Sequence, residues 1–244
     1  MAWETGNELS WDMHFSPWTK EISDYIKSIA PQQLVIDGHY GVDSESLKLT
    51  NVDIFSNHYR TKSELTNESQ YVSSSGKAYI LGEYKWNGGR NESDDLGSYL
   101  NNIELSKTNI AIFWSLFSHD DTKGFVMHND GYSMYYPGIS ADEINRTQMI
   151  RGHFFRMRNS SVILHSPPNS PLLQGTKNGT QVVLSWRGSP TSATYILERS
   201  SNQGTSWEVI NSSLKDINPN ITDIPPKFPV SYRLKGVTPD NVHG

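Results

Sequence analysis

Two glutamates stand at the ends of short apolar segments, where a folded sheet would present their side chains. Glu8 follows the segment Ala-Trp-Glu-Thr-Gly-Asn, and Glu83 follows Tyr-Ile-Leu-Gly. Their separation in the chain corresponds to three strand–helix units of about 25 residues each. Two carboxylates that meet at one site can divide acid and nucleophile roles in the cleavage of a glycosidic bond. A glutamate taken alone is more often a solvated residue at a loop start, so the elements that carry this pair decide between the two interpretations.

Residues 1–160 alternate short apolar segments with amphipathic ones. The apolar segments predict strands buried on both faces, at residues 1–3, 33–37, 52–55, 78–82 and 110–117. The segments between and after them predict helices, at residues 16–30, 62–75, 91–107 and 140–158. A βαβα order at about 25 to 30 residues per unit predicts a parallel sheet with right-handed crossovers. A closed (β/α)8 barrel needs about 250 residues, so the predicted fold class is α/β: a partial TIM barrel with an open sheet edge and an exposed apolar interior.

The last third of the chain has a different pattern. Residues 165–171, HSPPNSP, predict a stiff linker between a partial-barrel domain at 1–164 and a module at 172–244. Within that module the predicted strands are short and separated by Gly, Pro, Asn and Ser, and they span residues 181–186, 195–199, 206–210 and 230–234. The pattern is typical of a small all-β, immunoglobulin-like sandwich.

Four short motifs, in order and at unit spacing, make the pattern of the partial-barrel segment more specific. They are Trp-Glu-Thr-Gly-Asn-Glu ending at Glu8, Asp-Ile-Phe-Ser-Asn-His ending at His58, Gly-Glu-Tyr around Glu83, and Phe-Trp-Ser around Trp114. Together they resemble strands four, six, seven and eight of the retaining clan A glycoside hydrolases. The chain is similar to fungal family 5 endo-β-1,4-mannanase-like proteins over about residues 1–160, and the strands that precede this segment in the family are absent here. The module at 172–244 resembles a fibronectin type III domain, in which Trp207 is expected to be half-buried rather than an exposed sugar-stacking residue.

The resemblance implies a role for each matching residue. Glu8 would be the acid/base and Glu83 the nucleophile, Asn7 would hold the sugar 2-hydroxyl, and His58 would support both carboxylates. Trp114 would form the floor of the subsite at the scissile bond. The resemblance favours two further sugar contacts less strongly, Trp86 and His119. No metal and no organic cofactor is implied.

One departure from the family pattern lies next to His58. The family places a Tyr two positions after this His, whereas here that position is Arg60. Because side chains alternate along a strand, Arg60 is expected to share the face of His58, with Tyr59 pointing away. A guanidinium there would depress the pKa of Glu83 and blunt its nucleophilicity.

Composition restricts partners and compartment. A net charge of -5 disfavours nucleic acid, and no stretch approaches the about 18 to 20 apolar residues of a membrane span. The chain has no Cys, which excludes disulfides, thiolate metal sites and cysteine nucleophiles. Seven Asn-x-Ser/Thr sequons favour secretion and glycosylation, although residues 1–9 do not have the composition of a signal peptide. The expected protein is a secreted monomer that acts on a polysaccharide.

Two functions from different classes remain open. The first is a retaining glycoside hydrolase that cleaves a β-1,4-linked, mannan-like polysaccharide, and whether the chain as printed catalyses is left open. The second is a non-catalytic carbohydrate-binding or adhesion protein in which the incomplete barrel is a sugar platform and the sandwich makes the contacts.

Overall fold

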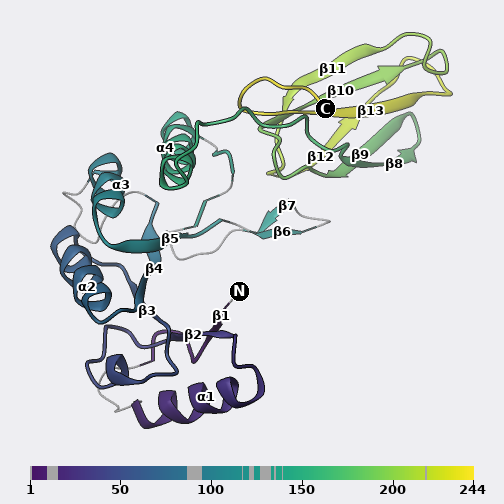
Figure 1. Ribbon diagram of the computed structural model, residues 1–244. Coiled ribbons are helices and arrows are strands. Elements are labelled where there is room, and N and C mark those ends of the chain that lie inside the picture. Colours follow the sequence, from purple (N-terminus) through teal and green to yellow (C-terminus); the bar gives the residue numbers. More distant parts are fainter. Residues whose placement is uncertain are drawn as a thin grey trace. The chain divides into compact units, whose positions relative to one another are not determined.

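The protein consists of two compact units, Met1–Ser115 and Leu116–Gly244 (Figure 1). The structure is a computed structural model that describes residues 2–9, 16–86, 95–116, 118–120, 124–126, 133–134, 136–138, 140–217 and 219–244. For residues 118–120 and 124–126 it describes the backbone only. None of the described helices is both long and apolar enough to cross a membrane.

The first unit contains a five-stranded parallel sheet in the order β1-β2-β3-β4-β5. Its strands are β1 (Ala2–Glu4), β2 (Leu34–Asp37), β3 (Ile54–His58), β4 (Ala78–Lys85) and β5 (Thr108–Trp114). Between them lie α1 (Ser16–Ile29), the 3-10 turn η1 (Ser46–Lys48), α2 (Lys62–Ser74) and α3 (Leu96–Leu105). Neighbours in sequence are neighbours in the sheet, as the βαβα rhythm predicts. Figure 1 shows α2 and α3 side by side along β3, β4 and β5.

Local sequence explains where these helices begin. Thr61 caps α2 in a capping box, since its hydroxyl accepts from the Glu64 backbone N–H while the Glu64 side chain accepts from the backbone of Thr61. Asp95 caps α3 by accepting from the Ser98 N–H. The helix expected from residue 91 therefore begins at Leu96, and residues 91–94 lie outside the described residues.

One face of the sheet packs against helices. In register along this face lie Asp37 of β2, Phe55 of β3 and Tyr79 of β4, all buried. Leu65 and Val72 of α2, with Tyr99, Leu100 and Ile103 of α3, are buried residues of the helices on this side. This packed face makes the sheet a rigid support for whatever its strand ends carry.

The opposite face is open to water at β5 and at the start of β2, whereas Ile54 and Ile80 on the same face are buried. Ile110 and Ile112 of β5 are 50% and 53% exposed, and Leu34 of β2 is 44% exposed. Ile110 lies in register with Ile80 of β4, which places these side chains on the face away from the helices. The expected open sheet with an exposed apolar interior is thus present.

The second unit contains α4 (Ala141–Met157), a short hairpin of β6 (Ser118–Asp120) and β7 (Gly124–Val126), and a β-sandwich. Helix α4 begins where expected, since the Ser140 hydroxyl accepts from the Glu143 N–H at 3.2 Å. The hairpin was not expected from the sequence. The strand predicted to reach residue 117 ends at Trp114, and residue 117 lies outside the described residues.

The sandwich consists of two antiparallel three-stranded sheets, β11-β10-β13 and β12-β9-β8. Their strands are β8 (Leu172–Asn178), β9 (Gln181–Arg187), β10 (Thr194–Ser200), β11 (Glu208–Leu214), β12 (Asn220–Asp223) and β13 (Ser231–Val237). Val182, Leu184 and Trp186 of β9 form one buried cluster with Tyr195, Leu197 and Leu234 of the other sheet. The all-β sheets predicted for the last third of the chain are present.

A carboxylate inside the sandwich joins its two largest core aromatics. Asp216 accepts from the Trp186 indole N–H at 2.9 Å and from the Tyr195 hydroxyl at 2.6 Å. All three side chains are buried. Burial, followed by the nearby Asp216 charge, raises the pKa of Tyr195 well above its usual value, so the hydroxyl stays a donor.

The segment at 165–171 packs against the end of the chain. The His165 backbone N–H donates to Asp240 Oδ2 at 2.7 Å, and the His165 imidazole hydrogen-bonds the same oxygen and the Tyr136 hydroxyl. Pro168 lies against Gly236 and Gly244, where an added Cβ would come within 3.1 and 2.2 Å of Pro168 atoms. The linker boundary at 165–171 stays a prediction, and the two compact units divide at residue 115.

Candidate functional site

The loop after β1 brings Glu8 to the carboxyl end of the sheet. Residues 5–9 run beside the extension of β2, through hydrogen bonds from Leu9 N to Gly38 O and from Tyr40 N to Leu9 O. The two chain segments approach so closely that a Cβ on Gly38 would lie 2.0 Å from the Gly6 carbonyl oxygen. Glu8 itself has a φ of +50°, a backbone conformation that non-glycine residues adopt rarely and often at functional sites.

A register shift in β4 brings Glu83 beside His58. Asn57 pairs with Leu81, but the next pair is His58 with Glu83, so Gly82 is the extra residue of a bulge. An added Cβ on Gly82 would lie 2.7 Å from His58 Nε2 and 2.9 Å from Ser56 Oγ. Only glycine leaves space for the imidazole at this position.

The two glutamates meet at one imidazole nitrogen. His58 Nδ1 lies 2.8 Å from Glu8 Oε1 and 3.7 Å from Glu83 Oε1. One oxygen of each carboxylate and the imidazole nitrogen all lie within 4.8 Å of one another. His58 is buried, the Glu83 side chain is 16% exposed and that of Glu8 is 40% exposed. The arrangement places one sheltered and one solvent-facing carboxylate around a single positioning ring.

This cluster also has the donor types of a transition-metal site. Two carboxylates and one imidazole are ligands that zinc accepts, and their atoms lie close enough to approach one ion. The 2.8 Å hydrogen bond between His58 and Glu8 uses one imidazole nitrogen and one carboxylate oxygen. The cluster therefore combines an imidazole paired with one carboxylate and a second carboxylate 3.7 Å from the same nitrogen.

The other sequence-predicted residues belong to different strands and loops. Trp114 ends β5 in register with Lys85, which shares the strand face of Glu83 by alternation, and its side chain is 38% exposed. Asn7 is exposed in the loop next to Glu8 and forms no hydrogen bond within the described part of the chain. Trp86 directly follows β4 and is partly buried. His119 is in β6, where only the backbone is described.

The expectation for Arg60 is wrong. Strand β3 ends at His58, and Tyr59 has a φ of +49°, so the alternation that would have placed Arg60 beside Glu83 stops there. The Arg60 Nε instead donates to the His58 carbonyl at 2.8 Å, and a terminal nitrogen lies 3.8 Å from Glu68 Oε1. Glu68 also accepts from the Asn57 amide at 2.8 Å. Arg60 thus belongs to the support behind the sheet and does not pair with Glu83.

Two acidic side chains near the cluster were not singled out from the sequence. Partial desolvation, with the charges of Glu83 and Asp37, raises the pKa of Glu4, and His58 opposes the shift. Asp37 is buried, and its Oδ1 lies 2.6 Å from His39 Nδ1. Glu4 ends strand β1, two residues before Gly6. The alternation of side chains along this strand places Glu4 on the open face, and this pattern could have identified Glu4 from the sequence.

His39 should show the effect of Asp37 in its titration. The hydrogen bond to Asp37 raises the pKa of His39 above 6.5 despite burial. Because the folded pKa is raised, the stabilisation is complete below the unfolded value of about 6.5 and is lost as pH rises through the folded pKa. We expect NMR titration of the His39 imidazole to give a pKa above 6.5, and Asp37→Asn to lower it. An unchanged pKa in Asp37→Asn would contradict this assignment.

Gly82 should not tolerate a side chain. Gly82→Ala places a methyl group against the His58 ring, and overpacking of this kind costs about 1–3 kcal/mol. We expect displaced His58 imidazole signals in NMR spectra and a lower thermal midpoint of the first unit. Gly152→Ala in α4 is the matched control, because its Cβ would meet only the Arg156 guanidinium at 3.4 Å. Equal effects of the two substitutions would contradict the role given to Gly82.

Comparisons with known proteins return resemblances of fold only. The sequence matches no family model and no curated protein. Among solved structures, an endo-1,4-beta-mannanase from Rhizomucor miehei is similar with 19% identity and a TM-score of 0.48, over 65% of this chain and 54% of that one. A Fn3-like protein from Clostridium thermocellum has 23% identity and a TM-score of 0.28, over 32% of this chain and 83% of that one. A GH30 endoxylanase from Clostridium papyrosolvens has 12% identity and a TM-score of 0.33, over 96% of this chain and 65% of that one.

These resemblances carry no functional argument. The highest of the three identities is 23%, and the highest of the three TM-scores is 0.48. The chain spans about half the length of the mannanase, 54%.

Proposed function

We propose that the protein is a retaining glycoside hydrolase that cleaves a β-1,4-linked, mannan-like polysaccharide. The single observation that carries the proposal is the meeting of Glu8 and Glu83 at His58, with carboxylate oxygens within 4.8 Å of each other. Retaining enzymes hold their two carboxyl groups about 5 to 5.5 Å apart, whereas inverting enzymes need about 6.5 to 9.5 Å to seat a water. The spacing favours double displacement.

The first half of the proposed reaction forms a glycosyl ester. A Glu83 oxygen attacks the anomeric carbon, the bond from that carbon to the glycosidic oxygen breaks, and Glu8 gives its proton to the leaving oxygen. Glu83 is the more sheltered carboxylate and Glu8 the more exposed one, which suits a nucleophile under the sugar and an acid that exchanges protons with water. Glu83 ends this step covalently bound, and Glu8 ends it ionised.

The second half restores the enzyme. Glu8 takes a proton from a water molecule, the water oxygen attacks the anomeric carbon, and the ester bond to Glu83 breaks. His58 is a positioning residue for both carboxylates. Asn7 at the sugar 2-hydroxyl and Trp114 under the ring are the proposed substrate contacts, with Trp86 and His119 as further ones. The proposed reaction uses no metal and no organic cofactor.

The proposed setting is extracellular, and the proposed acting form is a monomer with a polysaccharide as its partner. Five of the sequon asparagines are exposed, namely Asn67, Asn145, Asn159, Asn178 and Asn220. Exposed acceptors of this type are accessible to glycosylation in a secreted protein. Mass spectrometry of the chain expressed through a secretory route would detect glycans at these positions.

Stereochemistry tests the proposal directly. Mannan, glucan and xylan oligosaccharides are incubated with the chain, and NMR follows the anomeric configuration of the first product. We expect β-configured reducing ends from the mannan-type substrate. Initial release of the α-anomer would contradict double displacement, and no release from any of the three would overturn the hydrolase proposal for this chain.

A second candidate is a non-catalytic carbohydrate-binding protein. The open sheet face with exposed Ile110 and Ile112 favours it, since an active site at a barrel mouth is usually surrounded by further strands. Binding of the same oligosaccharides with no release of reducing sugar would support this alternative.

A further inference from the structure

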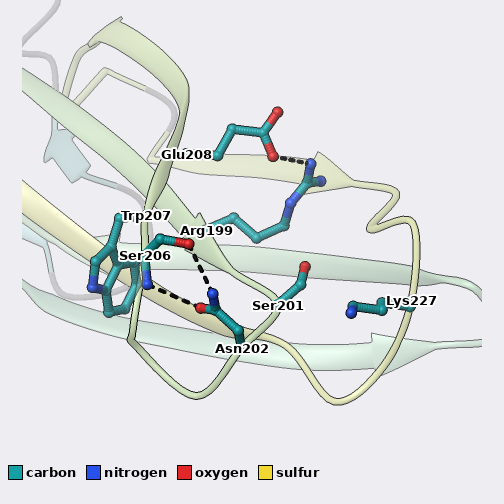
Figure 2. Close-up of a pocket in the computed structure, with 7 residues that line it drawn as sticks. All are labelled: Arg199, Ser201, Asn202, Ser206, Trp207, Glu208 and Lys227. Atoms are coloured by element: carbon teal, nitrogen blue, oxygen red, sulfur yellow. Dashed lines mark hydrogen bonds and ion pairs between the residues drawn. The ribbon is translucent and has the colours of Figure 1, made fainter.

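A cavity of about 230 Å³ lies at one end of the sandwich, far along the chain from the glutamate cluster. Figure 2 shows its lining residues, which come from the end of β10, the following turn, the start of β11 and the segment after β12. They are Arg199, Ser201, Asn202, Ser206, Trp207, Glu208 and Lys227. The volume lies below the about 300 Å³ at which pockets for drug-sized ligands begin, so the cavity suits a single small ring.

The turn between β10 and β11 is held in one conformation. Asn202 donates from its amide to Ser206 Oγ at 2.8 Å and accepts from the Ser206 backbone N–H at 3.0 Å (Figure 2). Gln203 and Gly204 both have positive φ, at 58° and 86°, which closes the turn. A turn fixed by its own hydrogen bonds does not have to be ordered by a ligand.

Arg199 forms a fixed wall of the cavity. One terminal nitrogen donates to both oxygens of Asp223, at 2.9 and 2.8 Å, and the other donates to Glu208 at 2.8 Å (Figure 2). Its side chain is only 10% exposed. Its Nε is buried and has no hydrogen-bond partner among the described residues. The guanidinium charge is balanced by two carboxylates, which hold this side chain in one position.

Trp207 supplies an aromatic surface. It is half-buried, as expected from the sequence, but it is not part of the buried cluster between the two sheets. The Arg233 guanidinium carbon lies 4.2 Å from the centroid of the indole ring, and Arg233 does not line the cavity. The indole is therefore held in place from outside the cavity while part of its surface faces in.

Two further donors face the cavity without partners. The Lys227 ammonium and the Ser201 hydroxyl form no hydrogen bond or ion pair within the part of the chain that the structure describes. Figure 2 shows the Lys227 ammonium directed toward the turn that carries Ser201 and Asn202. The lining therefore combines free donors, the acceptor oxygens of Glu208 and one aromatic surface.

We propose that this cavity binds one neutral pyranose unit of a carbohydrate chain. Sugars combine an apolar C–H face, which packs on an aromatic ring, with hydroxyls that need both donors and acceptors. Arg199 is paired with Glu208 and Asp223, so with Lys227 the charges around the cavity sum to zero and favour neither an anionic nor a cationic ligand, while the polar lining disfavours an apolar one. The site is for binding only. It does not depend on the proposed hydrolase, since the residues of the two sites belong to different compact units.

The test uses the full chain carrying Glu83→Gln, so that the probe is not cleaved. β-1,4-Mannotriose is added to the 15N-labelled protein up to about 20 mM, well above the expected Kd, and two-dimensional NMR follows the Trp207 indole N–H and the Ser201 and Lys227 amides. A single ring in a small cavity is expected to bind with a Kd on the order of 1 mM. Trp207→Ala should weaken binding about tenfold or more, and Lys227→Ala and Ser201→Ala should each weaken it several-fold.

The controls separate this site from others. Gln174→Ala and Ser212→Ala change exposed residues of the same module outside the cavity, and we expect Kd within about twofold of the parent. Cellotriose and trigalacturonic acid are added in parallel, and shifts at the cavity with either neutral trisaccharide support the proposal. Binding of the acidic sugar alone, or absence of any shift at the cavity, overturns it. Shifts confined to residues 2–9 and 54–86 also overturn it, and that outcome leaves the proposed hydrolase standing.

Discussion

Glu83→Ala is expected to lower kcat by roughly 10^4-fold or more on an aryl β-mannobioside. The reason is specific to this side chain: it is the sheltered carboxylate next to His58, whereas Glu8, the other glutamate of the cluster, is the more exposed one. The measurement is release of the aryl alcohol at saturating substrate. Circular dichroism checks that the fold is unchanged.

Rescue by a small anion sharpens this prediction. Alanine leaves room where the carboxylate stood, so azide can attack the anomeric carbon from the same side. The expected product is the glycosyl azide of inverted configuration, formed at a rate that rises with azide concentration. Glu21→Ala, an exposed glutamate of α1, is the matched control and should keep full activity. Equal activity of Glu83→Ala and the parent protein would remove Glu83 from the mechanism.

Asp216→Ala should cause the largest loss of stability in the sandwich. Removing this carboxylate leaves the Trp186 indole N–H without its partner and takes from the Tyr195 hydroxyl its closest acceptor, and both groups are buried. Each buried group left unsatisfied costs about 1–3 kcal/mol. For a module of about 75 residues the sum corresponds to a thermal midpoint lower by roughly 10 °C or more.

Calorimetry of the full chain measures this effect, because the transition that shifts can be matched to the loss of near-ultraviolet signal from Trp186. Asp142→Ala in α4 is the control, since that carboxylate is exposed and, among the described residues, forms only an i,i+4 ion pair with Arg146. Asp216→Asn keeps one acceptor oxygen, so its thermal midpoint should lie between those of Asp216→Ala and Asp142→Ala. A midpoint for Asp216→Ala equal to that of Asp142→Ala would show that the buried carboxylate contributes no stability.

The elements of the first unit could be predicted because each signal is local. Strands Leu34–Asp37 and Ile54–His58 each contain a short apolar run with a buried residue, Val35 and Phe55, and Ser16–Ile29 has a proline in its first turn. The strands of the sandwich were predicted less completely. Strand β8, Leu-Leu-Gln-Gly-Thr-Lys-Asn, is exposed along almost its whole length, so it carries no alternation of buried and exposed residues. Strand β12 has only four residues.

Side-chain direction at the site was harder to predict than element type. The bulge at Gly82 and the positive φ of Tyr59 both interrupt the period-two alternation on which the sequence argument depended. A glycine before Glu83 is visible in the sequence, but its contact with His58 requires the register of two strands. No residue type near Tyr59 signals that the strand ends after His58. The prediction for Arg60 failed because it assumed that the alternation of side chains continued past this point.

The contrast between the two faces of the five-stranded sheet has a practical consequence for engineering. Leu81 and Ala111 are enclosed by helices, so their volumes are constrained to within a methyl group. Ile110 and Ile112, on either side of Ala111 in the same strand, meet solvent instead. Hydrophilic replacements at Ile110 and Ile112 are therefore expected to raise solubility without disturbing the side chains packed on the helix-covered face of the sheet.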